Sequence, residues 1–342
     1  MNQLNTLQEP VSERENPDSN EDIQRNITDF PKLEKLHKDP YQYPQGVAFL
    51  DGQYVPMSQA KISVLDWGFL HSDATYDVMH AWEGRIFRHS LYLDRFFSGL
   101  KKLHMSIPYD EDDVMKIVKN CVALSGLRSS YIEIICTRGS SPTFSRDPRD
   151  SLNRFMAFAV PFSSVANPEQ QERGLHVAIS SRVRISPDSV DPSIKNYHWL
   201  DLVGGLYDAY QEGGETAILL DSNGNISEGP GFNVFVVKDG SLATPDFSIL
   251  PGITRRTVFD LCTELELTCE SRSVSPNELY EADEIFVTST AGGVMPVSKV
   301  SGKNVADGLV GPICQRIRNA YWEKHEDPDW SCAVLYPADK KE

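Results

Sequence analysis

Short turn-forming dipeptides between apolar, strand-like runs place the strongest constraint on how this chain can fold. Asp51-Gly52 lies between VAFL and QYV, Glu83-Gly84 between ATYDVMHAW and RIF, and Asp239-Gly240 between FNVFVVK and SLAT. Asp-Gly suits the type I′ turn that joins two antiparallel strands. Such hairpins recur in both halves, and strands do not alternate regularly with helices. The sheets are therefore predicted to be largely antiparallel or mixed. No GxGxxG motif follows a strand, so a dinucleotide-binding domain is not indicated.

Composition and periodicity divide the chain into two folded domains with polar segments around them. The predicted segments are a polar arm at 1–45, a small α/β domain at 46–162, a polar connector at 163–173, a larger domain at 174–325 and a tail at 326–342. Helices are predicted near 90–105, 110–125, 198–211 and 254–266, the second of them with Asp110 as its N-cap. Strands are predicted near 131–137, 155–161, 175–184 and 284–289. The expected fold class is therefore α/β, of the α+β type.

Charge and composition exclude several classes of function. The net charge is −16 and no basic stripe is present, so no nucleic-acid partner is expected. No apolar run approaches the ~20 residues of a membrane-spanning helix, so no membrane partner is expected. The N-terminus lacks a basic start followed by an apolar stretch, which favours a cytoplasmic protein. Six scattered cysteines without a CxxC pair predict free thiols, no disulfide framework and no metal site.

Three segments carry residues too specific for an ordinary core. They are 191–197 (DPSIKNY), 227–233 (SEGPGFN), and 250–255 (LPGITR) paired with 288–293 (TSTAGG). In these segments the chain resembles the fold-type IV pyridoxal-phosphate enzymes, which include branched-chain and D-amino-acid aminotransferases. The resemblance covers roughly residues 46–307. Within the family the chain most resembles the (R)-selective amine transaminases, because the run 71–78 (HSDATYDV) resembles their signature, as does Ile194-Lys195-Asn196 with Trp199 nearby.

The resemblance implies that Lys195 is the catalytic residue and carries pyridoxal 5′-phosphate as a Schiff base. A lysine amine can condense with the cofactor aldehyde and can then move a proton between substrate and cofactor carbons. Glu228 is implied as the partner of the pyridine nitrogen, since a carboxylate there keeps that nitrogen protonated.

The cofactor phosphate needs hydrogen-bond donors, which the chain offers in three places. A helix is predicted to open near Ile253 and Thr254, and the amides of a helix N-terminus bind dianions. Thr290 begins a second small-residue turn. By resemblance, Arg88 is the phosphate-binding arginine, and a guanidinium can engage two oxygens at once.

The substrate side is implied by alternation along two strands. Tyr76 and Val78 share one strand face, and Tyr131 and Glu133 share another. Where this chain has Tyr131-Ile132-Glu133, the branched-chain relatives have a sequence that resembles Tyr-x-Arg-Pro. Glu133 therefore stands where those relatives have an arginine. An anionic side chain there would repel an α-carboxylate by an amount on the order of a few kcal/mol. The remaining residues assigned to the substrate side are His71, with a structural role, and Trp199 and Ala291.

The amino-group acceptor, a 2-oxo acid, needs a cation for its carboxylate. The loop 139–147 resembles a loop of these enzymes that carries a mobile arginine. Arg146 is the best match, and Arg149 is its rival.

The resemblance as a whole implies a homodimer that transfers an amino group from an (R)-configured primary amine to a 2-oxo acid such as pyruvate. Three alternatives stay open at this point. One is an aminotransferase of the same fold acting on D- or branched-chain amino acids. Another is a lyase of the aminodeoxychorismate lyase type. The third is a non-catalytic binding protein built on this fold.

Overall fold

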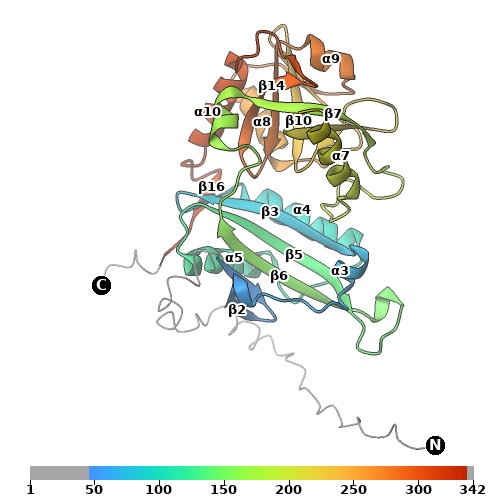
Figure 1. Ribbon diagram of the computed structural model, residues 1–342. Coiled ribbons are helices and arrows are strands. Elements are labelled where there is room, and N and C mark those ends of the chain that lie inside the picture. The colour runs from blue at the N-terminus through green and yellow to red at the C-terminus, as the bar shows by residue number, and fades with distance from the viewer. Residues whose placement is uncertain (1–45, 337–342) are drawn as a thin grey trace, which may run out of the picture.

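The computed structural model describes residues 46–336 and contains two β-sheets, one above the other in Figure 1, each with its own helices. The first sheet has the strand order β16-β4-β3-β5-β6-β1-β2. The second has the order β12-β11-β10-β13-β14-β7-β8, with β9 beside β10 and β15 beside β14. The predicted α+β class with largely antiparallel or mixed sheets is thus confirmed. The predicted arm at 1–45 lies outside the described residues.

The first sheet is antiparallel at each pair that orders its strands. Its strands are β1 (Val47–Leu50), β2 (Gln53–Pro56), β3 (Ala74–Trp82), β4 (Arg85–Phe87), β5 (Ser130–Ser140), β6 (Leu152–Pro161) and β16 (Ser331–Ala333). Asp51 and Gly52 have φ values of 51° and 74°, and Glu83 and Gly84 have 50° and 85°. A type I′ turn needs positive φ at both central residues, so both predicted hairpins form as expected.

Two long helices cover one face of this sheet, which leaves the other face free for the second sheet. They are α4 (His89–Lys102) and α5 (Glu111–Ser125), and shorter helical turns are η1 (Met57–Gln59), α3 (Trp67–His71) and η2 (Pro148–Asp150). The Asp110 carboxylate accepts the Asp113 N–H at 2.8 Å, which makes it the N-cap predicted for α5. Met79 and Ile132 pack with the apolar stripes of both helices. By alternation, Tyr76 and Val78 face the opposite way.

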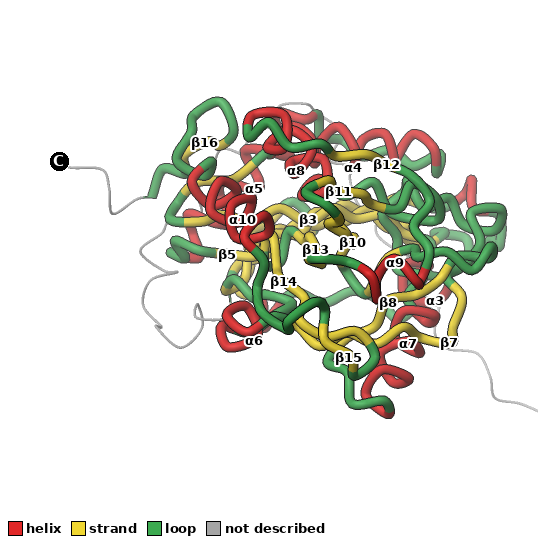
Figure 2. The backbone as a smooth tube through the Cα atoms, turned by 90° about the horizontal axis from the view of Figure 1, so that it is seen from above, coloured by secondary structure: helices red, strands yellow, loops and turns green. Residues whose placement is uncertain are grey.

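The second sheet is mixed, and its strands β10, β13 and β14 lie near the centre of Figure 2. β7 pairs parallel to β14 and β8, and β11 pairs parallel to β12. The strands are β7 (Leu175–Val183), β8 (Thr216–Leu220), β9 (Glu228–Gly229), β10 (Phe232–Lys238), β11 (Ser241–Thr244), β12 (Cys269–Ser271), β13 (Glu284–Ser289), β14 (Gly293–Val300) and β15 (Lys303–Asn304). The helices are α7 (Leu200–Gln211), α8 (Ile253–Glu264), α9 (Pro276–Glu281) and α10 (Pro312–Glu323).

Two segments are more ordered than their polar sequences indicate. The connector contains α6 (Pro168–Arg173), which starts at a capping box between Asn167 and Gln170. This helix buries none of its residues, so apolar periodicity could not have indicated it. The segment predicted as a tail from 326 contains β16, which pairs with β4. The end of the described chain therefore belongs to the first sheet rather than hanging free.

The cysteines are free thiols, as predicted. Cys121, Cys136, Cys262 and Cys314 are buried, and Cys269 and Cys332 are half-buried. Within residues 46–336, no helix is both long enough and apolar enough to cross a bilayer.

Candidate active site

A cavity of about 260 Å³ lies between the two sheets and has walls from both. Ten of the residues proposed from the sequence line it: Tyr76, Val78, Tyr131, Lys195, Trp199, Glu228, Ile253, Thr254, Thr290 and Ala291. The structure does not bring four others to its wall: His71, Arg88, Glu133 and Arg146. Residues far apart in the sequence thus meet at one place because the two sheets face each other.

Lys195 is held at the cavity by the edge of β3. Its carbonyl oxygen accepts hydrogen bonds from the Thr75 hydroxyl at 2.9 Å and the Tyr76 N–H at 3.1 Å. Its Nζ lies 4.7 Å from the centroid of the Tyr76 ring. Burial lowers the pKa of Lys195, and the nearby Arg95 cation lowers it further. A lowered pKa leaves more of the amine neutral, which is the form that acts as a nucleophile or base.

Glu228 lies across the cavity on β9 and is fixed by three donors. One carboxylate oxygen accepts from Arg184 Nε at 3.0 Å, and the other from the Leu250 N–H at 2.9 Å and from Asn233 Nδ2 at 3.5 Å. Burial raises the pKa of Glu228, and the Arg184 cation opposes that rise. Arg184 also binds Asp201 at 2.6 Å. Sequence reasoning missed Arg184, because its role depends on a contact between the segment that follows β7 and Glu228 on β9, which are far apart in the sequence.

The end of the cavity near α8 is rich in unused donors. The N-cap residue of this helix, Gly252, offers no side-chain cap to the first amides. The hydroxyls of Thr254 and Thr288 are buried and make no hydrogen bond of normal geometry with the described residues. Thr290 Oγ1 lies 2.9 Å from the Tyr92 hydroxyl. Buried donors need partners, so this cluster fits a phosphate group.

Arg95 lines this end of the cavity, whereas Arg88 is not among the lining residues; the Arg88 Nε is nevertheless buried without a hydrogen-bond partner among the described residues, so its role as phosphate ligand stays a prediction. Arg95 lines the cavity and bonds both oxygens of the fully buried Asp77, at 2.7 and 2.8 Å. Arg88 forms an ion pair with Asp260 and lies over the Trp330 ring at 4.2 Å. The two arginines differ in backbone position: Arg88 ends the turn before α4 with φ of 52°, whereas Arg95 lies about two helical turns further along. The sequence feature that could have indicated Arg95 is Asp77, because an acid within an apolar strand needs a buried cation as its partner.

Glu133 is buried directly behind the cavity wall rather than on it. The Tyr197 hydroxyl donates to its Oε1 at 2.5 Å, and the Tyr131 hydroxyl donates to its Oε2 at 3.2 Å. Burial raises the pKa of Glu133, and the Tyr197 hydrogen bond opposes that rise. Its β3 neighbour is Val78, which does line the cavity. The strand alternation proposed for Tyr131 and Glu133 therefore holds, while Tyr197 was missed.

His71 and Arg146 lie on the outside of this chain. His71 is exposed at the end of α3, with its ring 4.8 Å from that of Trp67. Arg146 is exposed in the loop between β5 and β6, which projects beyond the sheet in Figure 1. Its rival, Arg149, is exposed too and bonds Asp147. Neither arginine reaches the cavity of its own chain, because the loop leads away from it.

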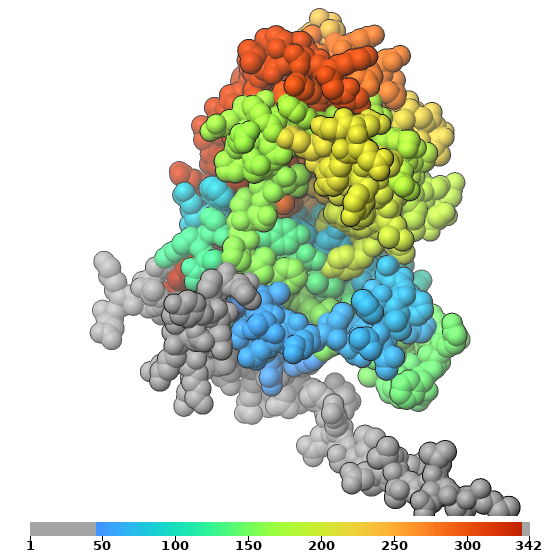
Figure 3. All heavy atoms as spheres, in the orientation of Figure 1, coloured from blue at the N-terminus to red at the C-terminus, as the bar shows by residue number. Residues whose placement is uncertain are grey.

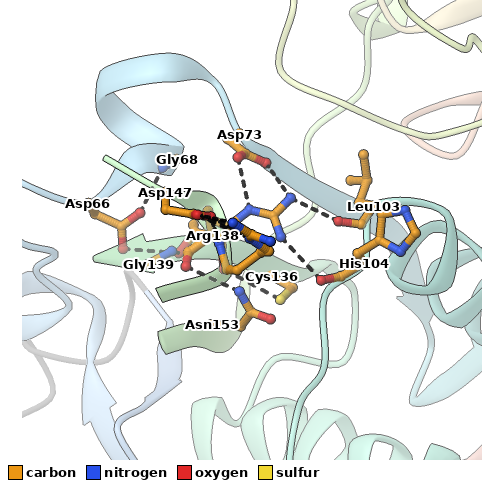
Figure 4. Close-up of polar contacts among 12 residues, drawn as sticks. Asp66, Gly68, Asp73, Leu103, His104, Cys136, Arg138, Gly139, Asp147 and Asn153 are labelled. Carbon is orange, nitrogen blue, oxygen red and sulfur yellow. Dashed lines mark hydrogen bonds and ion pairs between the residues drawn. The ribbon is translucent and has the colours of Figure 1, made fainter. Parts of the chain in front are cut away.

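Arg138 fixes the base of this loop, as Figure 4 shows. Its guanidinium bonds both oxygens of Asp73, at 2.9 and 3.1 Å, and the carbonyls of Leu103 and His104. The start of β3, the end of β5 and the end of α4 are thereby tied together. The exposed tip of the loop thus extends from a rigid base.

Comparison with known proteins agrees with this site. Residues 74–300 match the family model described as amino-transferase class IV. The branched-chain-amino-acid aminotransferase of Escherichia coli (strain K12) is 30% identical over 80% of this chain and 91% of its own length. A solved structure of the E. coli branched-chain amino acid aminotransferase has a TM-score of 0.81 at 27% identity, covering 85% of this chain and all of the other. The T.th. branched-chain amino acid aminotransferase with pyridoxamine 5′-phosphate has a TM-score of 0.80 at 27% identity, covering 85% and 99%.

The fold and the cavity define an aminotransferase that depends on pyridoxal phosphate. The chain belongs to the class IV aminotransferases, the group with fold type IV. The expected family, fold and cofactor are thus confirmed. The relatives named above are branched-chain enzymes, so selectivity for (R)-amines stays a proposal.

Replacing Arg95 by Lys should weaken the binding of pyridoxal phosphate to the apoenzyme by ~10- to 100-fold. Lys keeps the charge beside Asp77 but loses the forked donors, and a hydrogen bond to a charged group contributes about 1.5–3 kcal/mol. Fluorescence titration of the apoenzyme measures the dissociation constant. Arg88→Lys is the matched control and should change it less than about threefold. A larger effect of Arg88→Lys than of Arg95→Lys would show that Arg88 is the phosphate ligand.

Proposed function

We propose that this enzyme transfers an amino group from an (R)-configured primary amine without an α-carboxylate to a 2-oxo acid such as pyruvate. The observation that carries this proposal is Glu133, a buried acid directly behind the substrate side of the cavity. The (R) configuration rests on the resemblance of residues 71–78 and 194–199 to the (R)-selective amine transaminases.

The charges around the cavity favour a donor without a carboxylate. Arg95 and Arg184 are the arginines of its described wall, and they already pair with Asp77 and Glu228. Each of these guanidinium charges is already balanced by a buried acid, so neither adds a net positive charge that would attract an α-carboxylate at the substrate end. An ionised Glu133 adds a repulsion of about 2 kcal/mol at a separation of roughly 8 Å and an effective dielectric constant of about 20. An amine lacking the carboxylate avoids that penalty.

The residues that line the cavity would have separate roles in cofactor binding and proton transfer. Ile253, Thr254, Thr290 and Arg95 would hold the phosphate, and Glu228 would hold the ring nitrogen. When bound, pyridoxal phosphate supplies an electron sink that stabilises negative charge on the donor's α-carbon. Lys195 Nζ would accept the α-proton from the donor carbon and deliver it to the cofactor carbon, since its lowered pKa keeps the amine available as a base.

A second candidate is a branched-chain amino acid as the donor. The relatives reported above favour it, because they are branched-chain aminotransferases about 30% identical to this chain. Val78 and Ile194 also give the cavity an apolar wall that would suit a branched side chain. The two candidate donors differ in whether the α-carbon carries a carboxylate, so a comparison of the rates with each kind of donor separates them.

We propose in addition that the enzyme is a homodimer in which the partner copy supplies Arg146. Several large apolar side chains are exposed around α3 and the nearby loop: Val64 (70%), Leu65 (51%), Phe69 (66%), Leu70 (51%) and Phe144 (82%). The light-blue and green lobes at the lower right of Figure 3 belong to these two segments. An exposed apolar patch of this kind is typical of a protein interface. If this apolar patch packs against a second copy of the chain, Arg146 could reach the cavity of that copy.

With pyruvate as the acceptor, the wild-type enzyme should use (R)-1-phenylethylamine at least about tenfold better than L-leucine or D-alanine, in terms of kcat/KM. The expected margin follows from the repulsion of about 2 kcal/mol. Initial rates with each donor at saturating pyruvate decide this. A preference for L-leucine would establish the branched-chain candidate instead.

Lys195→Ala should lower the rate of the first half-reaction by at least ~10³-fold, because no other described base lies at the same place. Rapid mixing of the holoenzyme with donor, followed by its visible spectrum, measures that rate. Lys303→Ala, on the exposed strand β15, serves as the control and should react like the wild type. A normal rate of amino transfer in the Lys195→Ala variant would contradict the proposed role of Lys195 as the catalytic base.

Arg146→Ala should raise KM for pyruvate by ~10- to 100-fold, because a charged hydrogen bond to the acceptor carboxylate is lost. The rate of the donor half-reaction should stay unchanged, since the amine carries no carboxylate. Arg149→Ala is the control, and an effect confined to it would show that the rival arginine binds the acceptor.

In analytical ultracentrifugation, the enzyme should sediment with twice the mass of one chain. A monomer with full activity would contradict the proposed dimer.

A further inference from the structure

Tyr197 occupies a position that the reaction as described does not use. Its hydroxyl donates to Glu133 Oε1 at 2.5 Å, whereas Tyr131 reaches the other oxygen at 3.2 Å. Its ring is stacked on that of Tyr76, with centroids 4.1 Å apart and planes 6° from parallel. The Tyr76 ring in turn lies under Lys195 Nζ, at 4.7 Å. Tyr197 therefore touches both the acid behind the cavity and the aromatic surface beneath the reacting amine.

Glu133 has few groups that can stabilise its charge. Its carboxylate meets Tyr131 from β5, Tyr197 from the loop before α7, and Tyr76 and Asp77 from β3, with the Lys195 amine nearby. Asp77 disfavours a second negative charge but is already neutralised by Arg95. On the described chain, no arginine or lysine forms a salt bridge with Glu133, so the two phenol groups supply its direct hydrogen bonds. The shorter of these two bonds comes from Tyr197.

We propose that Tyr197 is a positioning and specificity-determining residue: it holds Glu133 as a carboxylate and so excludes donors that carry an α-carboxylate. The proposal rests on the proposed function, because it explains how the chain maintains the charge that favours a plain amine. Hydrogen bonds to the ionised form stabilise that form in a buried place. Without the Tyr197 hydroxyl, Glu133 would take up a proton, and a neutral Glu133 repels a carboxylate ligand far less.

The direction of the pH effect follows from the same contacts. Burial already raises the pKa of Glu133, and Tyr197 opposes the rise. Tyr197→Phe removes that opposition, so the pKa of Glu133 should move further up. A larger fraction of Glu133 would then be protonated at low pH than at high pH. Discrimination against carboxylates should become pH-dependent in the variant.

The test compares binding of 4-methylvalerate with that of its neutral amide to the holoenzyme, by calorimetry at about pH 6 and about pH 9. In the wild type, the ratio of the two affinities should be nearly constant over this range. In Tyr197→Phe, the acid should gain about three- to tenfold relative to the amide at the lower pH, and the gain should vanish at the higher pH. An unchanged ratio at both pH values would overturn the proposal.

Two further variants separate this effect from loss of packing. Tyr207→Phe removes an exposed hydroxyl on α7 and should behave like the wild type. Glu133→Gln should abolish the discrimination at every pH, and adding Tyr197→Phe to it should change nothing more. A further change in that double variant would mean that Tyr197 acts through Tyr76 stacking and not through Glu133. The donor comparison with the wild type tests the proposed function separately, because it does not involve Tyr197.

Discussion

The site depends on one electrostatic constraint: a charge placed between the two sheets must be stabilised within the protein, by a counter-charge or by hydrogen bonds. Burying an unpaired charge costs several kcal/mol, whereas a paired and hydrogen-bonded one can be held. Asp77 and Arg95 satisfy this requirement on one side of the cavity, and Glu228, Arg184 and Asp201 satisfy it on the other. Lys195 is thus the cation on the described cavity wall without a salt-bridge partner, which leaves its amine available for chemistry.

This constraint also explains which parts of the site the sequence could predict. Hairpins, the Asp110 cap, Lys195 and Glu228 follow from local patterns and from a family resemblance, and the structure has them where predicted. Arg184 and Tyr197 depend on contacts between segments far apart in the chain, which no local pattern encodes. The phosphate role of Arg88 stays a prediction, and sequence spacing did not show that Arg95 lines the cavity, because spacing does not show which way a side chain points from the start of a helix.

Donor choice in this fold need not depend on a large change of the cavity. The chain keeps the fold of branched-chain aminotransferases at about 30% identity or below. The proposed difference lies in one acid behind the wall and the phenol groups that bind it. Charge acts over several ångströms, so a residue outside the wall can exclude a ligand without touching it. The cavity surface can then remain aromatic and apolar while its electrostatic preference changes.

The pairing of β16 with β4 has a consequence for when this enzyme can become active during its synthesis. Ser331 lies on the edge strand of a sheet whose other strands all precede the second sheet in the sequence. Arg85, on β4, also bonds Ser331 and the His325 carbonyl. The first sheet therefore stays incomplete while the ribosome makes the whole second sheet. A chain without residues 327–336 would lack β16 and its pairing with β4.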